Sequence, residues 1–201
     1  MNGNDGLLEA RGLGFAHPGT DVLRGLSFRV GPGLTIVRGG DGRGKTTLLR
    51  LLAGVLAPTA GAIERHAASV FYEQPADAAH DQVVAKAWLD AQRARHAGWN
   101  DELVSALAEA FVLVPHLGKP LFMLSAGSRR KVGLVAAAAS GAPLTLLDTP
   151  FAALDAASAR VLADVLAEAA EDTARAWVVA DHEIPAVLQG VALAGVIDLG
   201  D

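Results

Sequence analysis

The stretch RGGDGRGKTT (residues 38–47) constrains this chain more than any other, because it places four glycines directly before a lysine and two threonines. The apolar run LTIVR precedes the glycines, and KTTLLRLLAGVL, with apolar residues at helical spacing, follows them. Gly39, Gly44 and the pair Lys45–Thr46 fit the pattern G-x-x-x-x-G-K-[ST]. The stretch therefore predicts a tight loop between a buried strand and a helix, as in an α/β domain.

A loop of this composition is suited to binding phosphate. Glycines let backbone N–H groups close around a phosphate without obstruction, and the helix N-terminus adds favourable partial charge. Lys45 would reach the outer phosphates, and the hydroxyl of Thr46 would hold Mg²⁺. A plain glycine-rich turn is the alternative, but it does not explain a lysine and a hydroxyl at these offsets. We therefore interpret the stretch as a phosphate-binding loop.

An acidic residue at the end of a second strand supports this interpretation. The run LTLLD (144–148) predicts a buried strand that ends in Asp148. Phosphoryl-transfer proteins with such a loop use an acid in this place to hold Mg²⁺, usually through water. A strand-terminal acid can also simply cap a turn. Together with the phosphate-binding loop, the metal function is the better explanation.

The pattern along the chain predicts strands that alternate with helices. Apolar or alternating runs indicate strands at 25–30, 34–38, 69–72, 144–148 and 176–180. Helical patterns follow the loop, occupy 157–170 and dominate between about Pro75 and Phe122. This order predicts an α/β fold with a mainly parallel sheet covered on both faces and an inserted helical lobe. Chemistry in such folds gathers at the carboxyl ends of the strands.

Composition excludes several function classes. The formal charge of −5 argues against a nucleic-acid binder that works through a basic surface, so we expect no nucleic-acid partner. The absence of cysteine excludes disulfides and zinc–thiolate sites. The longest uncharged run, Val132–Leu147, is interrupted by Ser140, Gly141 and Pro143, and so predicts a buried helix, a turn and a strand rather than a membrane span. We expect a cytoplasmic protein.

Several short motifs in a fixed order resemble the ATPase subunits of ATP-binding cassette (ABC) transporters. The run LSAGSRRKV (124–132) is similar to the family's Leu-Ser-Gly-Gly-Gln signature and precedes Asp148 at a suitable distance. The remaining matches are Gln74 for the Q-loop, FAALD with Asp155 for the D-loop, His182 for the switch histidine and His17 for the residue that stacks on adenine. The length and the Leu-Ser-Ala-Gly variant are also similar to the small haem-exporter ATPases of cytochrome c maturation.

The resemblance implies a single ATPase domain over residues 1–201. Its fold would be a P-loop NTPase (RecA-like) core with an antiparallel β subdomain, the core formed by 1–74 and 142–201 and the helical lobe by 75–141. The implied cofactors are ATP and Mg²⁺. The implied ATP contacts are His17, Gly39, Gly40, Asp41, Gly42, Arg43, Gly44, Lys45, Thr46, Thr47 and Gln74. The implied metal ligands are Thr46, Gln74 and Asp148. The implied catalytic residues are Lys45, Asp148 and His182.

The resemblance also implies partners. ATP would lie between the phosphate-binding loop of one subunit and the signature of another in a head-to-tail homodimer, or in a heterodimer with another ABC ATPase. The signature residues that contact the ATP of the opposite subunit would be Ser125, Ala126, Gly127 and Ser128. Gln74 would report occupancy to separate transmembrane permease subunits, which would hold the chain on the cytoplasmic face of the membrane.

The chain departs from the family where catalysis is expected. The family places a glutamate after the strand-terminal aspartate to polarise the attacking water, whereas here Asp148 is followed by Thr149 and Pro150. A threonine cannot accept a proton at neutral pH, so hydrolysis is expected to be slow. Ala126 and Ser128 alter the signature, Asp41 replaces a frequent asparagine, and Arg43 replaces a small residue.

Two functions therefore remain open. The chain is either the energy-coupling ATPase of a transporter with slow hydrolysis, or a hydrolysis-deficient regulatory or structural subunit paired with a competent ATPase. His182 could partly compensate for the missing glutamate by orienting water.

Overall fold

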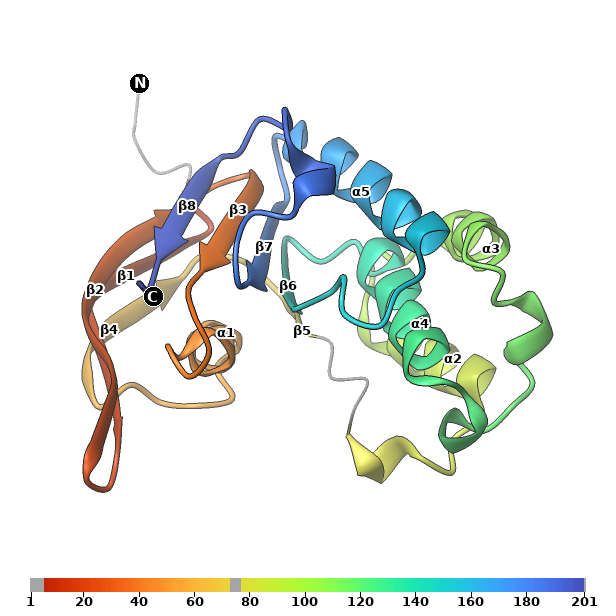
Figure 1. Ribbon diagram of the computed structural model, residues 1–201, viewed down its shortest axis with the longest axis horizontal. Coiled ribbons are helices and arrows are strands. Elements are labelled where there is room, and N and C mark those ends of the chain that lie inside the picture. The colour runs from red at the N-terminus through yellow and green to blue at the C-terminus, as the bar shows by residue number, and fades with distance from the viewer. Residues whose placement is uncertain (1–5, 73–76, 201) are drawn as a thin grey trace. The chain divides into compact units, whose positions relative to one another are not determined.

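A computed structural model describes residues 6–72 and 77–200 of the chain (Figure 1). The chain divides into two compact units. The first contains the described residues up to Tyr72, together with Pro143–Thr149 and the chain from Leu166 onward. The second contains the described residues from 77 to 142, together with Pro150–Val165. Each unit is described separately below.

The first unit is built on a parallel sheet in the order β5-β6-β7-β3-β8. Every neighbouring pair in this sheet is parallel, which confirms the predicted fold class. The bounds are β3 Gly33–Arg38, β5 Val70–Tyr72, β6 Leu144–Asp148, β7 Ala176–Asp181 and β8 Gly195–Asp198. In register, Asp148 is opposite Ala180 and Arg38 is opposite Asp181, so these strands end at the same edge of the sheet.

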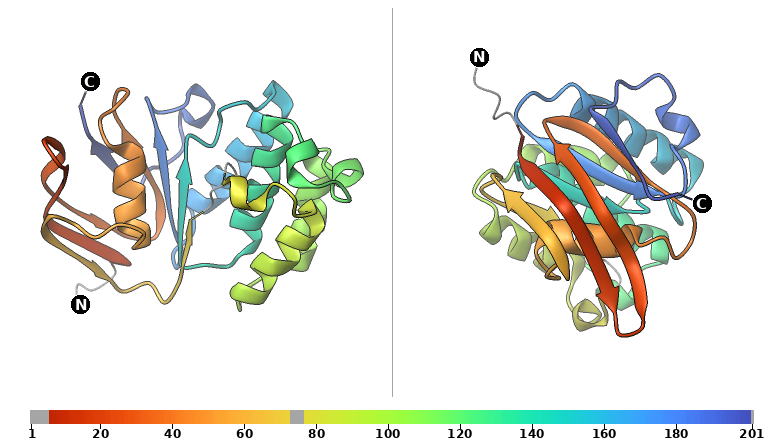
Figure 2. Two further views of the ribbon diagram at one scale, coloured as in Figure 1. Left: turned by 90° about the horizontal axis from the view of Figure 1, so that it is seen from below. Right: turned by 90° about the vertical axis from the view of Figure 1, so that its left-hand side faces the viewer.

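A second, antiparallel sheet in the order β2-β1-β4 confirms the antiparallel β subdomain. Its strands are β1 Leu8–His17, β2 Thr20–Val30 and β4 Ala60–Arg65, and the right-hand view of Figure 2 shows β1 and β2 as a long hairpin. The strand predicted at 25–30 is the second half of β2. The sequence did not reveal β1 because three register irregularities between Ala10 and Ala16 break its period-two alternation.

Helix α1 (Lys45–Ala53) packs in the core of the first unit, where its buried leucines meet apolar residues from both sheets. The pattern predicted a helix through residue 56, but α1 ends earlier because Gly54 adopts a left-handed conformation with φ 78°. The guanidinium of Arg65 donates to the carbonyl oxygens of Leu51 and Leu52, at 2.5 and 2.8 Å. These bonds tie β4 to the last turn of the helix, where carbonyl groups lack the usual intrahelical partner and the Leu51 carbonyl accepts the amide of Gly54 instead.

The second unit is helical, as the inserted lobe was predicted to be. Its helices are α2 Ala85–Arg95, α3 Asp101–Ala110, α4 Ala126–Ala139 and the larger part of α5, which spans Ala156–Ala170. Short 3₁₀ turns occupy η1 Ala78–His80, η2 Val114–His116 and η3 Leu121–Met123, and a fourth, η4 Ala186–Leu188, lies in the first unit. The predicted bounds of the helical lobe, 75–141, remain a prediction.

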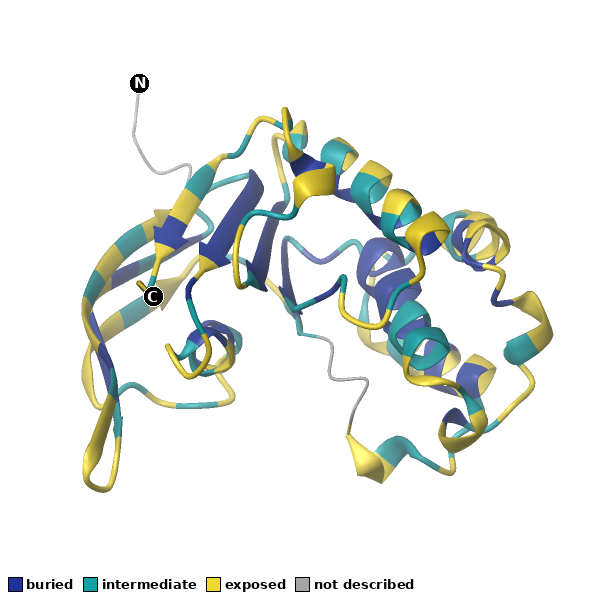
Figure 3. Ribbon diagram, in the orientation of Figure 1, coloured by how far each residue is buried: buried dark blue, intermediate teal, exposed yellow. Residues whose placement is uncertain are grey.

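Burial confirms the interpretation of the uncharged run Val132–Leu147. Every residue of α4 from Val132 to Ala139 is buried, and so are Leu144–Leu147 of β6, as the dark ribbon segments in Figure 3 show. Gly141, in a left-handed conformation with φ 63°, makes the turn between them. Among the helices of residues 6–72 and 77–200, none has the length and apolar character needed to cross a membrane.

Candidate functional site

The glycine-rich loop connects β3 to α1, and two of its glycines have a left-handed backbone that other residues rarely adopt. Gly44 is the N-cap of α1 and has φ 90°, in the left-handed region. A Cβ atom at Gly44 would come within 2.8 Å of the Val22 side chain and 2.9 Å of the Leu23 side chain. Gly42 also has a positive φ, of 74°. The loop therefore needs glycine for its backbone conformation and for its close approach to β2.

The amino end of α1 is suited to an anion. The amide of Leu48 donates to the carbonyl of Gly44 at 2.7 Å, which closes the first helical turn. The amides before Leu48, from Lys45 to Thr47, have no partner within the helix, as at any helix N-terminus. In the part of the chain that the structure describes, no side chain caps this end through a hydrogen bond. These amides and the helix dipole fit a phosphate group.

Lys45 extends its ammonium group back over the loop. Its Nζ donates to the carbonyl oxygens of Gly39 at 2.5 Å and Gly40 at 2.8 Å. The residue is only 8% exposed, although a buried cation is costly unless it is paired or hydrogen-bonded. Lys45 therefore both holds the loop together and places a positive charge at its concave side.

Thr46 and Asp148 come together although 102 residues separate them in the sequence. The hydroxyl of Thr46 donates to Oδ2 of Asp148 at 2.6 Å. A hydroxyl and a carboxylate are hard oxygen ligands of the kind that Mg²⁺ prefers. The donor set therefore fits the predicted metal ion, which these two residues would hold. The third predicted ligand, Gln74, lies outside the described residues.

Thr149 follows Asp148 in an unusual backbone conformation. Its φ is 43°, and its amide donates to the carbonyl of Ala180 at 2.8 Å. A positive φ is rare for a β-branched residue and marks a strained position. The side chain at this position carries a hydroxyl rather than a carboxylate, so it cannot serve as a general base.

His182 lies between two carboxylates. Its Nε2 is 2.7 Å from Oδ1 of Asp41, and its Nδ1 is 3.5 Å from Oδ1 of Asp181. The hydrogen bond to Asp41, followed by that to Asp181, raises the pKa of His182 above its usual value, and Lys45 opposes the shift. Both ring nitrogens face carboxylates, an arrangement that favours the protonated imidazolium over the neutral ring.

These elements line one pocket of about 310 Å³, which lies within the first unit. The lining residues are Val22, Asp41, Gly42, Arg43, Gly44, Lys45, Thr46, Thr47, Asp148, Thr149 and His182. Most of the residues predicted to bind the nucleotide are thus brought together. His17 does not line this pocket: it is exposed at the end of β1, with its ring edge-on to that of Phe15, 5.0 Å away.

Comparison with known proteins identifies the family of the chain. Residues 23–152 match the family described as ABC transporter. The chain belongs to the ABC transporter family. It is an ATP-binding subunit of that family, and its P-loop architecture agrees with solved ATP-binding cassettes.

The relatives of this ABC protein include proteins named for export and proteins named for import. The cytochrome c biogenesis ATP-binding export protein CcmA of Rhodospirillum rubrum is 39% identical, over 73% of this chain and 67% of that protein. The CcmA of Paramagnetospirillum magneticum is 35% identical, over 82% and 83%. The Fe(3+) ions import ATP-binding protein FbpC 3 of Rhodococcus jostii is 34% identical, over 96% of this chain and 60% of that protein.

Solved structures share the fold. An ABC transporter ATP-binding protein from Pyrococcus furiosus superimposes with a TM-score of 0.74 and 21% identity, over 96% of each chain. The RNase-L inhibitor has a TM-score of 0.77 and 22% identity, over 94% of this chain and 36% of that one. At these identities the likeness concerns the fold alone.

The residues predicted to form the signature of this ABC protein lie in the second unit, at the start of α4. Ser125 is the N-cap of the helix and accepts a hydrogen bond from the amide of Ser128 at 3.1 Å. The hydroxyl groups of the two serines are 3.0 Å apart. Ala126 is exposed at the first helical position. A Cβ atom at Gly127 would collide with the carbonyl oxygen of Ala153, so packing within the unit requires a glycine there.

Asp155, the residue predicted to end the D-loop, caps α5. Its carboxylate accepts hydrogen bonds from the amide of Ser158 at 2.9 Å and from the hydroxyl of Ser158 at 3.0 Å. It also pairs with Nζ of Lys131, on α4, at 2.9 Å. The bond from the Ser158 amide, followed by that from Lys131, holds the pKa of Asp155 well below its usual range.

The sequence did not reveal two of these contacts. Asp41 was expected at ATP but not as the partner of His182, and no partner was predicted for Lys131, which pairs with Asp155. The sequence did contain a signal for the contact between Asp41 and His182, because an aspartate stands where the family frequently has an asparagine. For Lys131 the sequence offered no signal, because its partner comes from another element.

Proposed function

We propose that this chain binds Mg-ATP in the pocket of the first unit and hydrolyses it slowly. In this proposal the chain drives conformational change in separate transmembrane permease subunits. The observation that carries the proposal is the pocket itself. It combines a complete phosphate-binding loop and a paired Thr46 and Asp148 with Thr149 in place of the catalytic carboxylate.

The contacts of the loop support nucleotide binding independently of hydrolysis. The amides at the start of α1 and the ammonium of Lys45 would bind the outer phosphates, which carry most of the negative charge of ATP. When bound, Mg²⁺ held by Thr46 and Asp148 would neutralise part of that charge. None of these groups depends on the side chain of residue 149.

Slow turnover follows from the groups that surround the attacking water. A positioned general base is worth about 10²–10⁴-fold in rate. Thr149 offers no base, and His182 faces Asp41 and Asp181 through both ring nitrogens. His182 would therefore contact the γ-phosphate as a proton donor rather than activate water.

Dimerisation is the second part of the proposal. Ser125, Ala126, Gly127 and Ser128 would contact the ATP bound by another subunit, in a head-to-tail homodimer or in a heterodimer with another ABC ATPase. The exposed position of Ser125 and Ala126 at the amino end of α4 supports this assignment, because a helix N-terminus attracts phosphate. His17 would stack on adenine, and Gln74 would report occupancy to the permease, which holds the chain on the cytoplasmic face of the membrane.

We further propose that the transporter is an exporter of the kind that CcmA proteins serve. The CcmA sequences of Rhodospirillum rubrum and Paramagnetospirillum magneticum, at 39% and 35% identity, support this direction. Thr149 favours a second candidate. The chain would then be a hydrolysis-deficient regulatory or structural subunit that supplies its signature to the ATP site of a competent partner.

Single-turnover hydrolysis tests the proposal. We would measure the rate at saturating Mg-ATP for the wild type and for Thr149→Glu, with the oligomeric state followed by light scattering. Thr149→Glu should raise the rate by at least about tenfold, below the full value of a base because its surroundings are not adapted to a glutamate. ATP affinity should change little, since the binding groups are intact.

Ala126→Asp in the Thr149→Glu background is the matched control. Ala126 is exposed at the first turn of α4, where an aspartate favours the helix, so the fold should be unaffected. The added charge should repel the γ-phosphate of the opposite subunit and abolish both the ATP-dependent dimer and the gained hydrolysis. A wild type that turns over as fast as Thr149→Glu would show that another residue is the base.

A further inference from the structure

We propose that Asp41 is a positioning residue that holds His182 in its protonated form and takes the place of a terminal phosphate oxygen until ATP arrives. The inference rests on the proposed function, because it concerns the same pocket. It adds a residue that acts before nucleotide binds and that distinguishes ATP from ADP.

The geometry carries the inference. Asp41 is part of the glycine-rich loop, and its side chain is 93% exposed, whereas His182 follows the end of β7. The 2.7 Å contact between Oδ1 of Asp41 and Nε2 of His182 therefore joins the phosphate-binding loop to the end of a neighbouring strand. Both residues line the pocket that we assign to the nucleotide. A carboxylate oxygen on Nε2 is the same kind of anionic acceptor as a phosphate oxygen.

The charges around His182 favour its protonated form. Asp41 faces Nε2 and Asp181 faces Nδ1, while Lys45 acts in the opposite direction. Arg43 and Asp148 complete the charged groups that line the pocket. Of the two carboxylates, Asp41 is the closer to a ring nitrogen, and it is the one that belongs to the loop. Asp41 should therefore be the group that binding of a phosphate disturbs.

A consequence for nucleotide selectivity follows. A γ-phosphate that binds Nε2 of His182 must displace the carboxylate of Asp41, and the two anionic groups repel each other. ADP lacks that phosphate and can leave the pair intact. The Asp41 carboxylate therefore opposes ATP more than ADP, and the imidazolium that it maintains is ready for the γ-phosphate once the carboxylate has moved.

The first test is made on the nucleotide-free full chain. The pKa of the His182 ring would be measured by NMR titration in the wild type, Asp41→Asn, Asp41→Glu and Asp181→Asn, with His182→Gln used to assign the resonance. Asp41→Asn should lower the pKa toward the ordinary histidine value of about 6.5. Asp41→Glu should restore part of the rise, and Asp181→Asn should have the smaller effect because its contact is longer. An unchanged pKa in Asp41→Asn would overturn the inference.

The second test measures affinity by isothermal titration below pH 6, where His182 is largely protonated in both proteins. Asp41→Asn should bind Mg-ATP about three- to tenfold more tightly than the wild type, with a smaller gain for ADP. Equal gains for ATP and ADP, or none, would contradict displacement of the carboxylate. If the wild type bound neither nucleotide, the proposed function would fail, whereas the NMR result would still decide whether Asp41 holds His182.

Discussion

Gly127 lies where the first turn of α4 comes so close to the carbonyl oxygen of Ala153 that no side chain fits between them. Ala153 has a positive φ of 62°, so the turn before α5 is itself in an unusual conformation. The family resemblance explains this glycine by contact with a phosphate. The structure adds a packing requirement inside the second unit, which a substitution would disturb before any ligand is considered.

Gly127→Ala should therefore destabilise the protein. Because the obstacle is backbone rather than a flexible side chain, we expect the free energy of unfolding to fall by about 1–3 kcal/mol, as for other overpacked sites. Gly118→Ala is the matched control in the same unit, since a Cβ atom at Gly118 meets nothing within 4 Å. Urea unfolding of the two variants would check the difference. Equal stability of both would contradict the close packing of Gly127 on Ala153.

Thr149 illustrates what the sequence could and could not predict at a single residue. The order Asp148-Thr149-Pro150 was sufficient to predict that the usual base is missing. It did not predict the positive φ of Thr149, because a hydrophobic pattern does not fix the backbone conformation of the residue that follows a strand. A glutamate is not branched at Cβ, so the Thr149→Glu variant should add no backbone strain.

Among the helices and strands, those with a regular hydrophobic pattern were predicted well from the sequence, and those with an irregular pattern were not. The strands of the parallel sheet are short apolar runs that end at a change in composition, and four of the five were predicted near their observed bounds. Strand β8 (Gly195–Asp198) was missed because Ile197 alone of its four residues is buried, so it lacks the continuous apolar run of β6 and β7. Strand β1 was missed because its register irregularities remove the alternation.

The amino end of α5 joins two helices through one carboxylate. Asp155 caps α5 through Ser158 and pairs with Lys131 of α4, whose side chain is only 12% exposed. The hydrogen bond from the Ser158 amide, followed by the pair with Lys131, lowers the pKa of Asp155 in the folded protein below the ordinary 3.8. A depressed carboxyl pKa stabilises the fold at pH values above the unfolded pKa, and this contribution is lost as the pH falls toward the folded pKa.

Asp155→Asn should remove the negative charge and keep the helix cap, because an asparagine can still cap a helix. The variant should be less stable than the wild type at pH 7, and the difference should narrow as the pH falls below about 3.8. Urea unfolding across this pH range would measure it. Asp90→Asn, which removes an exposed carboxylate from α2, serves as the control. A gap between wild type and Asp155→Asn that is independent of pH would contradict the account of the Lys131 pair.

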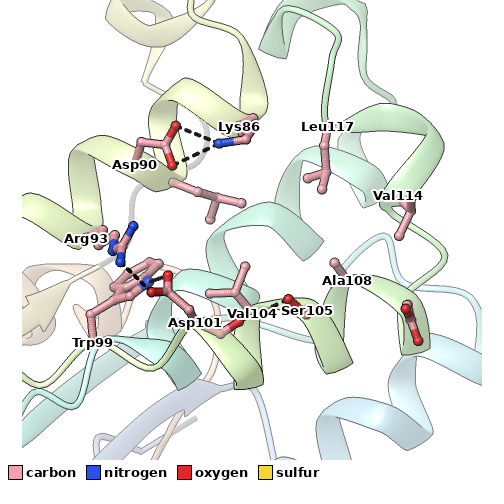
Figure 4. Close-up of a pocket in the computed structure, with 12 residues that line it drawn as sticks. Lys86, Asp90, Arg93, Trp99, Asp101, Val104, Ser105, Ala108, Val114 and Leu117 are labelled. Atoms are coloured by element: carbon pink, nitrogen blue, oxygen red, sulfur yellow. Dashed lines mark hydrogen bonds and ion pairs between the residues drawn. The ribbon is translucent and has the colours of Figure 1, made fainter.

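Beyond the nucleotide pocket, the second unit contains a groove between α2 and α3. Its cavity of about 380 Å³ has apolar walls that include Trp99, Val104 and Leu117, and its rim carries the ion pairs Lys86–Asp90 and Arg93–Asp101 (Figure 4). The sequence predicted the helical lobe that contains this groove. It could not predict the groove, because the walls come from α2, α3 and the segment that follows them, and a sequence pattern does not give the packing of these elements.

In the molecule as a whole, the proposed nucleotide pocket and the proposed signature belong to different units. The family match over residues 23–152 includes parts of both. In the proposal, the groups that bind the phosphates lie in the first unit, whereas hydrolysis would also require the signature of a second chain. The claim on which every other proposal depends is that the glycine-rich loop binds Mg-ATP.

Isothermal titration of Mg-ATP into the wild type, Lys45→Ala and Lys45→Met tests that claim most directly. Lys45 is buried and supports the loop, so Lys45→Met, which retains an apolar stem, separates loss of charge from loss of packing, and thermal unfolding of each variant checks the fold. Lys86→Ala, on the exposed face of α2, is the control. We predict that the wild type and Lys86→Ala bind alike and that both Lys45 variants lose at least about tenfold in affinity. Folded Lys45 variants that bind Mg-ATP as tightly as the wild type would contradict the account.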